Sequence, residues 1–201
     1  SIEEFEYHVD MARWMGYGKT WHDGCKINIH ISGKRGPEGL LKEFPRLSQE
    51  ARNLITIEND EMGHGLESTL QVAKEIALVL DIHHHWIRAE EYISPNDDRV
   101  KRVIDSWRGV RPTLHYSYSR DEHLAPAELG SKMHSEMHDI KMLLERGCKK
   151  QKLRAHSDLL PNAKVNDWAL SFGEHFDIQT EAKGKNLAAE QLYRQHLKNL
   201  V

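Results

Sequence analysis

Five short segments of the chain share a pattern that restricts the fold more than any other feature of the sequence. In each segment apolar and polar side chains alternate, and the polar face carries a histidine or a carboxylate near the end of the segment. Alternation of this kind predicts β-strands with one apolar and one polar face. The predicted strands are Lys26–Ile31, Leu54–Asn59, Ala77–Ile82, Thr113–Ser117 and Phe176–Glu181.

Helical periodicity fills most of the stretches around these strands. Strands that alternate with helices predict parallel pairing through right-handed crossovers. The predicted helices are residues 1–15, a segment that opens at Pro37, residues 66–76, a segment from Ser94 through Trp107, a long helix over 126–147 and a last helix that runs to about Leu197.

The polar face of these strands excludes a parallel sheet that is covered by helices on both sides. Strands buried on both faces read as continuous apolar runs, whereas these strands carry polar residues toward their carboxyl ends. A (β/α) barrel accounts for the pattern, because helices cover its outside and its lumen opens onto the active site at the C-terminal ends of the strands. We therefore expect an α/β fold of TIM-barrel type that forms a single domain over residues 1–201.

Five strand-end residues would converge at the mouth of such a barrel, namely His30, Glu58, Asp81, His115 and Glu181. A hydrogen-bonded or exposed polar residue explains any one of them, but does not explain the same placement on every strand. Histidines and carboxylates together suit Zn²⁺, Mn²⁺ or a similar ion. Bound cations would also remove the repulsion that otherwise resists ionisation of neighbouring carboxylates. The sequence therefore predicts a metal site.

Composition narrows the setting of this site. Hydrophobic residues make up 39% and charged residues 29% of the chain, which is ordinary for a globular protein. No apolar run approaches the length of a membrane span, and no segment is typical of a signal peptide. Two cysteines, Cys25 and Cys148, cannot make a disulfide framework, which favours an intracellular, cytoplasmic protein. A net charge of −3 does not by itself indicate nucleic-acid binding.

Six short motifs, in order along the chain, resemble the UV damage endonuclease family, whose barrel is related to endonuclease IV and to xylose-isomerase-like enzymes. The resemblance runs from about residue 1 to 198. The motifs are Ile29-His30-Ile31 with Gly33-Lys34, Thr56 to Asp60, Leu80 to His84, Arg111 to Ser117, Ala155 to Asp158, and Asp177 to Lys183.

This resemblance implies a DNA-repair nuclease that hydrolyses the phosphodiester on the 5′ side of a UV photoproduct in double-stranded DNA. It also implies up to three divalent ions, with Mn²⁺ ahead of Zn²⁺ or Mg²⁺. Glu58, His115 and Glu181 would be the catalytic set. Carried over residue by residue, the metal ligands would be His30, Glu58, Asp81, His84, His115, His156 and Glu181.

Other histidines rank lower under the same resemblance. His83 and His85, which flank His84, are expected to support the site or to lie at the surface. His134 and His138 belong to a predicted helical insertion around residues 119–153, and they lack the His-Ser-Asp context of His156.

The chain departs from the family pattern at three points. The family barrel has eight strands and five are found here, so we expect the C-terminal five-strand portion of a barrel, with the first three strands N-terminal to Ser1. Such a sheet would be open, and its edges would favour self-association. Residues 119–153 look like an insertion. Thr113 stands where many family members have a lysine.

A nuclease of this kind needs cationic contacts to the DNA backbone. The candidates are Lys34 and Arg35 after the first strand and a basic run with Lys149, Lys150 and Lys152, although a solvated helix end explains that run equally well.

Two other functions stay open from the sequence. One is a sugar isomerase or epimerase of the xylose-isomerase-like type, and the other is a catalytically incomplete chain that only binds metal or DNA. The His156 motif and the pair of Asp81 with His84 favour the nuclease over the isomerase.

Overall fold

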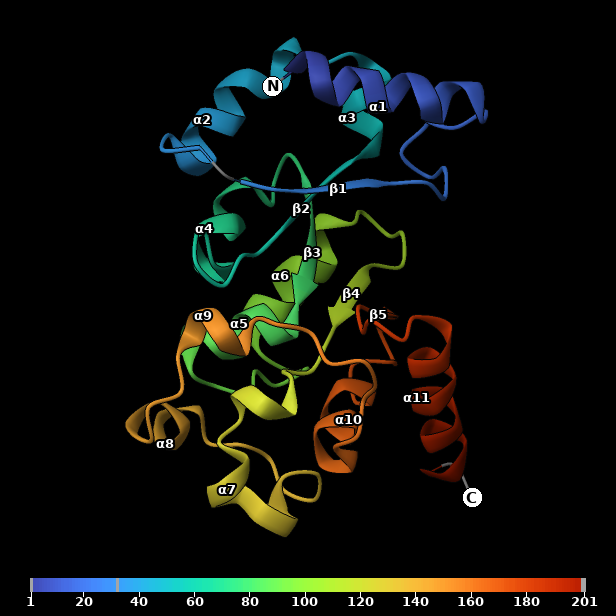
Figure 1. Cartoon of the computed structure of the whole chain (residues 1–201). Coiled ribbons are helices and arrows are strands. Elements are labelled where there is room, and N and C mark those ends of the chain that lie inside the picture. Colours follow the sequence, from blue (N-terminus) through green and yellow to red (C-terminus); the bar gives the residue numbers. More distant parts are fainter. Residues whose placement is uncertain (1, 32, 200–201) are drawn as a thin grey trace. The chain divides into compact units, whose positions relative to one another are not determined.

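The computed structural model describes residues 2–31 and 33–199, which fall into two compact units (Figure 1). The first unit comprises residues 1–80 and 98–112, and the second comprises residues 81–97 and 113–201. Parallel strands alternate with helices in the order β1-β2-β3-β4-β5, which confirms the predicted α/β class. Over the described residues this order is open, so no closed barrel forms there.

The first unit contains three parallel strands and the helices that connect them. Strand β1 pairs with β2, and β2 pairs with β3, in parallel register. The elements are α1 (Ile2–Trp14), β1 (Ile27–His30), α2 (Gly36–Glu43), the 3-10 turn η1 (Phe44–Arg46), α3 (Gln49–Leu54), β2 (Ile55–Glu58), α4 (Leu66–Thr69), the 3-10 turn η2 (Leu70–Val72), β3 (Ala77–Asp81) and α6 (Asp98–Ser106).

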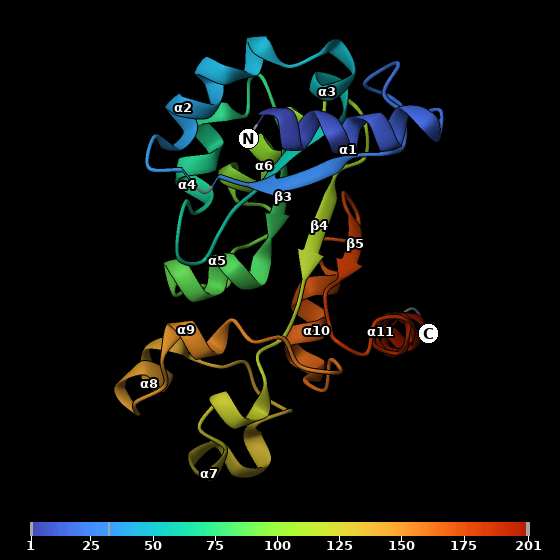
Figure 2. The ribbon, with the colours of Figure 1, turned by 45° about the horizontal axis from the view of Figure 1, so that its top comes forward.

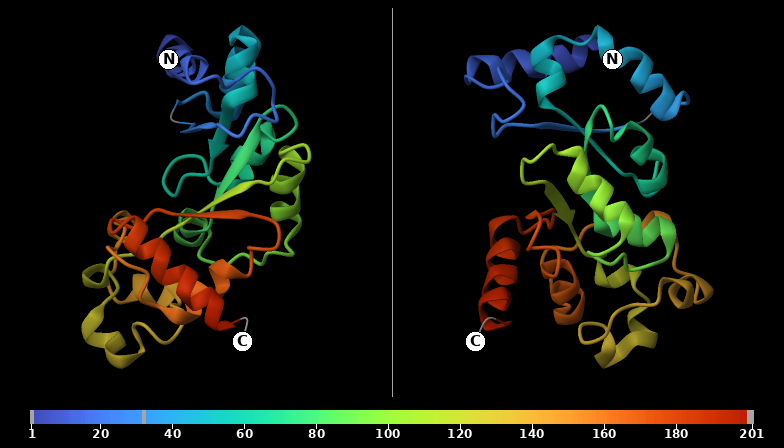
Figure 3. Two further views of the ribbon diagram at one scale, coloured as in Figure 1. Left: turned by 90° about the vertical axis from the view of Figure 1, so that its right-hand side faces the viewer. Right: turned by 180° about the vertical axis from the view of Figure 1, so that it is seen from behind.

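The second unit contains the other two strands, which run side by side in the same direction (Figure 2). The elements are α5 (Ile82–Ala89), β4 (Thr113–Tyr116), η3 (Asp121–His123), α7 (Pro126–Leu129), η4 (Gly130–Lys132), α8 (Ile140–Glu145), α9 (Lys150–Leu153), α10 (Ala163–Leu170), β5 (Asp177–Thr180) and α11 (Asn186–Asn199). Helices α10 and α11 lie next to each other (Figure 3), joined by a hydrogen bond of 2.9 Å from Asn166 Nδ2 to Gln195 Oε1.

Local sequence explains why the elements begin where they do. Ser48 begins α3 by accepting a 3.1 Å bond from the Ala51 amide, and Asn162 does the same for α10 through Val165 at 3.1 Å. Such side-chain caps satisfy amides that have no partner within the helix. The apolar residues Ile55 and Ile57 of β2 are almost fully buried.

The predicted helix over residues 126–147 is wrong. The structure has two short pieces there, α7 with η4 and then α8. Gly130 has φ of +51°, outside the helical region, and Asp139 begins α8 as a new cap. The carbonyls of Met133 and Glu136 accept bonds of 3.0 and 2.7 Å from Asn162 Nδ2 instead of serving a continuous helix.

Other differences concern short helices. The predicted helix over residues 66–76 ends at Val72, after α4 and η2. Helices α3, α5, α9 and α10 were not predicted, whereas the five strands agree with their predicted segments to within a residue or two. None of the described helices is long and apolar enough to cross a membrane.

Candidate metal and nuclease site

The polar face of β1 and β2 forms a chain of hydrogen bonds that ends on Glu58. Thr56 Oγ1 donates to Asn28 Oδ1 at 3.1 Å, and Asn28 Nδ2 donates to Glu58 Oε2. The register places Asn28 beside Thr56 and His30 beside Glu58. Strand alternation therefore puts all four side chains on the same face of the two strands. The Glu58 carboxylate, almost fully buried, is therefore oriented by its neighbouring strand.

His30 lies between two carboxylates of the same unit. Its Nε2 is 3.7 Å from Glu58 Oε2, and its Nδ1 is 3.8 Å from Asp60 Oδ2. The side chain of His30 is 40% exposed, so a ligand can reach it.

Asp81 ends β3 and begins α5. It is fully buried, and its Oδ1 accepts a 2.7 Å bond from the His84 amide as the helix cap. Its other oxygen, Oδ2, lies 3.5 Å from Nδ1 of His84. The first turn of α5 therefore brings His84 beside Asp81.

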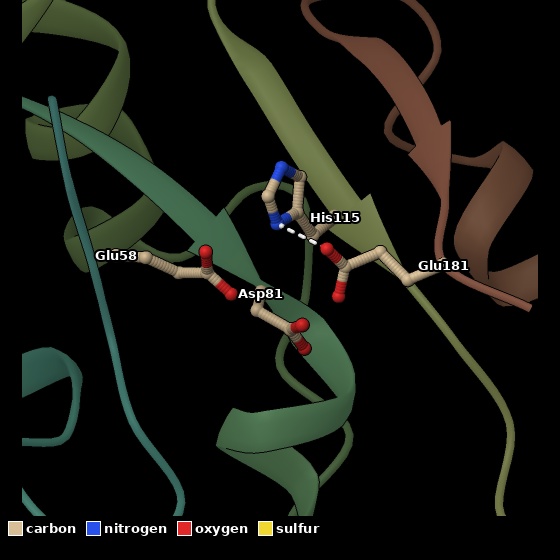
Figure 4. Close-up of side chains that lie close together, drawn as sticks. All are labelled: Glu58, Asp81, His115 and Glu181. Carbon is tan, nitrogen blue, oxygen red and sulfur yellow. Dashed lines mark ion pairs between the residues drawn. The ribbon is translucent and has the colours of Figure 1, made fainter. Parts of the chain in front are cut away.

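Asp81, His115 and Glu181 gather in the second unit (Figure 4). Each offers one possible ligand atom, and these atoms lie within 4.8 Å of one another. His115 Nδ1 is 3.3 Å from Glu181 Oε1. The register of β4 and β5 explains this pair, because the Glu181 amide, just past β5, donates to the Tyr116 carbonyl at 2.9 Å.

Figure 4 draws Glu58 of the first unit together with these three side chains. Within the first unit, Glu58 pairs in register with Val79 of β3. Asp81 follows Val79 by two residues, so strand alternation puts the side chains of Val79 and Asp81 on the same face of β3.

His156 has one ring nitrogen already engaged. Its Nδ1 donates to the Glu181 carbonyl at 2.7 Å, which leaves the proton on Nδ1 and presents Nε2 as the possible ligand atom. The His156 and His84 rings have centroids 6.4 Å apart, so these two predicted ligands are neighbours within the second unit.

His83 is buried, and its ring centroid lies 5.9 Å from that of His156. Ser117 Oγ lies 2.7 Å from its Nδ1, and its Nε2 lies 2.9 Å from Ser119 Oγ. Because Ser119 donates its own hydrogen to the Leu153 carbonyl, His83 donates from Nε2 and accepts at Nδ1. Burial lowers the pKa of His83 well below its ordinary value, so the ring is neutral. His83 is thus held by two hydrogen bonds in a buried position, and a supporting role for it at the site stays a prediction.

The other histidines of interest have partners elsewhere. His85 Nε2 lies 3.0 Å from Glu91 Oε1, and His134 Nε2 lies 3.0 Å from Asp121 Oδ2. His138 Nε2 is 2.6 Å from the Tyr118 hydroxyl.

The proposed DNA-contact residues differ in their surroundings. Lys34 and Arg35 are exposed and line a cavity of about 480 Å³ in the first unit, whose remaining lining is largely apolar. Lys149 and Lys152 are exposed in the second unit. Lys150 is half-buried, because its Nζ lies 2.8 Å from Glu90 Oε1 and donates to the Arg88 carbonyl at 3.3 Å.

Sequence reasoning did not single out Asn28 or Asp60. Asn28 lies within the strand predicted over Lys26–Ile31, and Asp60 lies in the motif from Thr56 to Asp60. The partner of Asn28 depends on strand register, and the partner of Asp60 depends on a turn. A short polar residue two positions from a strand-end ligand is the signal that could have identified them.

The donor set fits a divalent ion. Imidazole nitrogens and carboxylate oxygens suit Zn²⁺ and Mn²⁺, and buried carboxylates are costly unless a cation or hydrogen bonds compensate them. Asp81 and His115 are buried, and Glu181 is only partly exposed. Parallel strands with carboxylates and histidines at their C-terminal ends define a class, the α/β enzymes whose chemistry occurs where the strands end.

Within this class the chain belongs to the UV-endonuclease UvdE family, because the model of that family matches residues 1–200. This confirms the resemblance found in the sequence. The chain is 27% identical over 144 residues to the UV-damage endonuclease of Neurospora crassa, an alignment that covers 64% of this chain and 22% of that protein. It is 24% identical over 208 residues to the UV-damage endonuclease of Schizosaccharomyces pombe, covering 98% and 30%.

A solved structure shares the fold. The crystal structure of SacUVDE superposes with a TM-score of 0.67 at 22% identity, covering all of this chain and 58% of that one. The chain thus spans between 22% and 30% of the length of the two fungal relatives.

Proposed function

We propose that this protein is a metal-dependent endonuclease of DNA repair that hydrolyses the phosphodiester on the 5′ side of a UV photoproduct. The family match over residues 1–200 carries the proposal, and the gathering of Asp81, His115 and Glu181 supports it. A sugar isomerase of similar fold has no comparable support, because the matched family and relatives are named as endonucleases.

In this proposal Glu58, Asp81, His115 and Glu181 hold the metal core, with His30, His84 and His156 as further ligands. Bound divalent ions, up to three and with Mn²⁺ preferred, would supply an activated water and neutralise charge on the phosphate. Asn28 orients Glu58, and the Glu181 carbonyl orients the His156 ring. The buried carboxylates of Glu58 and Asp81 would interact with such ions more strongly than exposed ones, because burial lowers the effective dielectric constant.

Nicking of DNA tests this function. UV-irradiated supercoiled plasmid should be nicked in the presence of Mn²⁺, whereas unirradiated plasmid and chelator-treated samples should stay intact. Mapping of the cut on an end-labelled duplex with a single photoproduct should place it on the 5′ side. Glu58→Gln should nearly abolish nicking, because it removes an anionic ligand while keeping the shape of the side chain.

Glu67→Gln is the matched control, since Glu67 is exposed on α4 and pairs only loosely with Arg99 at 3.5 Å. It should nick at the wild-type rate. Unchanged nicking by Glu58→Gln would reject the proposed metal core. A wild-type protein that binds Mn²⁺ and damaged DNA but never nicks would instead establish the catalytically incomplete alternative.

A further inference from the structure

A carboxylate faces each of the two nitrogens of the His30 imidazole. Glu58 Oε2 lies 3.7 Å from Nε2, and Asp60 Oδ2 lies 3.8 Å from Nδ1. These are ion-pair separations, longer than a hydrogen bond. In a neutral imidazole one ring nitrogen carries a hydrogen and the other a lone pair, so only one of the two nitrogens can donate to a carboxylate.

Asp60 is held in place by its own turn. Its Oδ1 accepts the amide hydrogen of Met62 at 2.7 Å and that of Gly63. The Asp60 amide donates to the His64 carbonyl at 2.9 Å, which closes the turn. With Oδ1 committed to the turn, Oδ2 is the oxygen directed at His30.

The turn is itself anchored to the rest of the first unit. His64 Nδ1 lies 3.0 Å from Ser68 Oγ, near the end of α4. The His64 ring also fills the space beside Gly36, where an added Cβ would come within 2.8 Å of it. The position of Asp60 is therefore set by the fold and does not depend on a ligand.

We propose that Asp60 is a positioning residue for His30: its Oδ2 holds the imidazole proton on Nδ1, so that Nε2 presents its lone pair beside Glu58. Metal-binding histidines characteristically donate their second N–H to a carboxylate or carbonyl, which fixes the ring orientation and raises its basicity. This inference rests on the proposed function for the identity of the ligand, a divalent ion. The tautomer of His30 can be measured without nuclease activity.

Asp60→Asn separates this role from the structural role of the turn. Asparagine keeps an oxygen that accepts the Met62 and Gly63 amides, so the turn is retained. The amide nitrogen then replaces Oδ2 and brings N–H donors to His30 Nδ1. In this variant His30 should present its lone pair at Nδ1 and carry its proton on Nε2. A proton on Nε2 prevents that nitrogen from binding a metal ion.

Two measurements test the proposal. Long-range ¹H–¹⁵N NMR of the metal-free protein, about two pH units above the ordinary histidine pKa of about 6.5, reports the tautomer of each neutral ring. We expect His30, assigned by loss of its signal in His30→Gln, to be protonated at Nδ1 in the wild type and at Nε2 in Asp60→Asn. Calorimetric titration with Mn²⁺ should show affinity about tenfold to 100-fold weaker in that variant.

Asp105→Asn, exposed on α6, is the control for loss of one negative charge and should match the wild type in both measurements. Asp60→Ser, which can still accept from the turn amides but lacks the second oxygen, should give a mixture of His30 tautomers if Asp60→Asn fails to fold. An Nε2–H tautomer in the metal-free wild type, or no change of tautomer in either variant, overturns the proposal. Absence of Mn²⁺ binding by the wild type would count against the proposed function, while the tautomer result still decides the role of Asp60.

Discussion

Lys26 lies just before β1 and holds three backbone segments together at the residue scale. Its Nζ donates to the carbonyls of Trp21, Asp23 and Asn53 at 2.6, 3.2 and 3.0 Å. It also lies 4.0 Å from the centroid of the Trp21 ring, a cation–π contact. Burial lowers the pKa of Lys26 to about 8, so near neutral pH the ammonium stays charged and the three carbonyls offset its desolvation.

Lys26→Met should therefore destabilise the protein. Methionine keeps the apolar stem but leaves partly buried carbonyls without their donor, a loss of about 1–3 kcal/mol in the free energy of unfolding. Urea denaturation at pH 7 measures it. Lys42→Met, exposed on α2, is the control and should change stability by less than about 0.5 kcal/mol. Equal stability of both variants would mean that the Lys26 bonds contribute nothing net.

Some residues of the candidate site could be predicted from the sequence, and others could not. Glu58 and Asp81 could be predicted as candidate ligands, because strand alternation fixes the face on which each lies. Asn28 could not be assigned its role, since its bond to Glu58 depends on the register between two strands. Asp60 could not be assigned its role either, because the turn over residues 60–64, beyond β2, decides which of its oxygens faces His30.

At the scale of elements, strands were easier to predict than helices. A period of two with a histidine or a carboxylate near the end of each segment indicated strands, and all five strands were found. The helix predicted over residues 126–147 was wrong although the apolar residues there recur at helical spacing. Hydrogen bonds from Asn162 and the positive φ of Gly130 interrupt a continuous helix. Helix α5 was missed because its first turn begins directly from the strand, with Asp81 as the cap.

Segment 133–138 of this insertion is fixed by a buried histidine. The His138 ring lies against the Tyr118 hydroxyl, and its amide donates to the Tyr92 hydroxyl at 3.1 Å. Burial lowers the pKa of His138, and nearby His134 lowers it further, whereas Asp121 acts in the opposite direction. The folded protein therefore binds a proton at this ring less readily than the unfolded chain.

Acid should consequently weaken the fold through His138. Below the ordinary histidine pKa of about 6.5 the unfolded chain takes up a proton that the folded ring resists, so the free energy of unfolding falls as pH falls. Urea denaturation at pH 7.5 and 5.5 should show a smaller loss for His138→Gln, whose amide nitrogen can still donate to the Tyr118 hydroxyl oxygen, because that hydroxyl gives its own hydrogen to the Met133 carbonyl. His175→Gln, exposed before β5, should lose as much as the wild type. Equal losses in all three proteins would contradict the assignment.

At the scale of the whole molecule, a net charge of −3 must be reconciled with the proposed substrate, DNA, which is a polyanion. A negative net charge does not prevent DNA binding, because a phosphate group interacts mainly with cations within about 10 Å at moderate salt. Arg146, Lys149, Lys152 and Arg154 are exposed near α8 and α9. Lys150, in the same run, is paired with Glu90. We infer that DNA contact depends on exposed members of the run, whereas Lys150 serves mainly to attach α9 to the end of α5.

The double variant Lys149→Gln with Lys152→Gln should weaken binding to damaged and undamaged duplex by the same factor, because phosphate contacts carry no lesion information. The slope of log affinity against log salt should become shallower by about two, since each phosphate contact contributes about 0.9. Lys150→Gln is the matched control, identical in charge change and adjacent in sequence, and should alter the slope by much less than one. Fluorescence anisotropy over a salt series measures both quantities. A slope that stays unchanged in the double variant would make the run a solvated surface only, and a change confined to damaged duplex would place these lysines at the lesion instead.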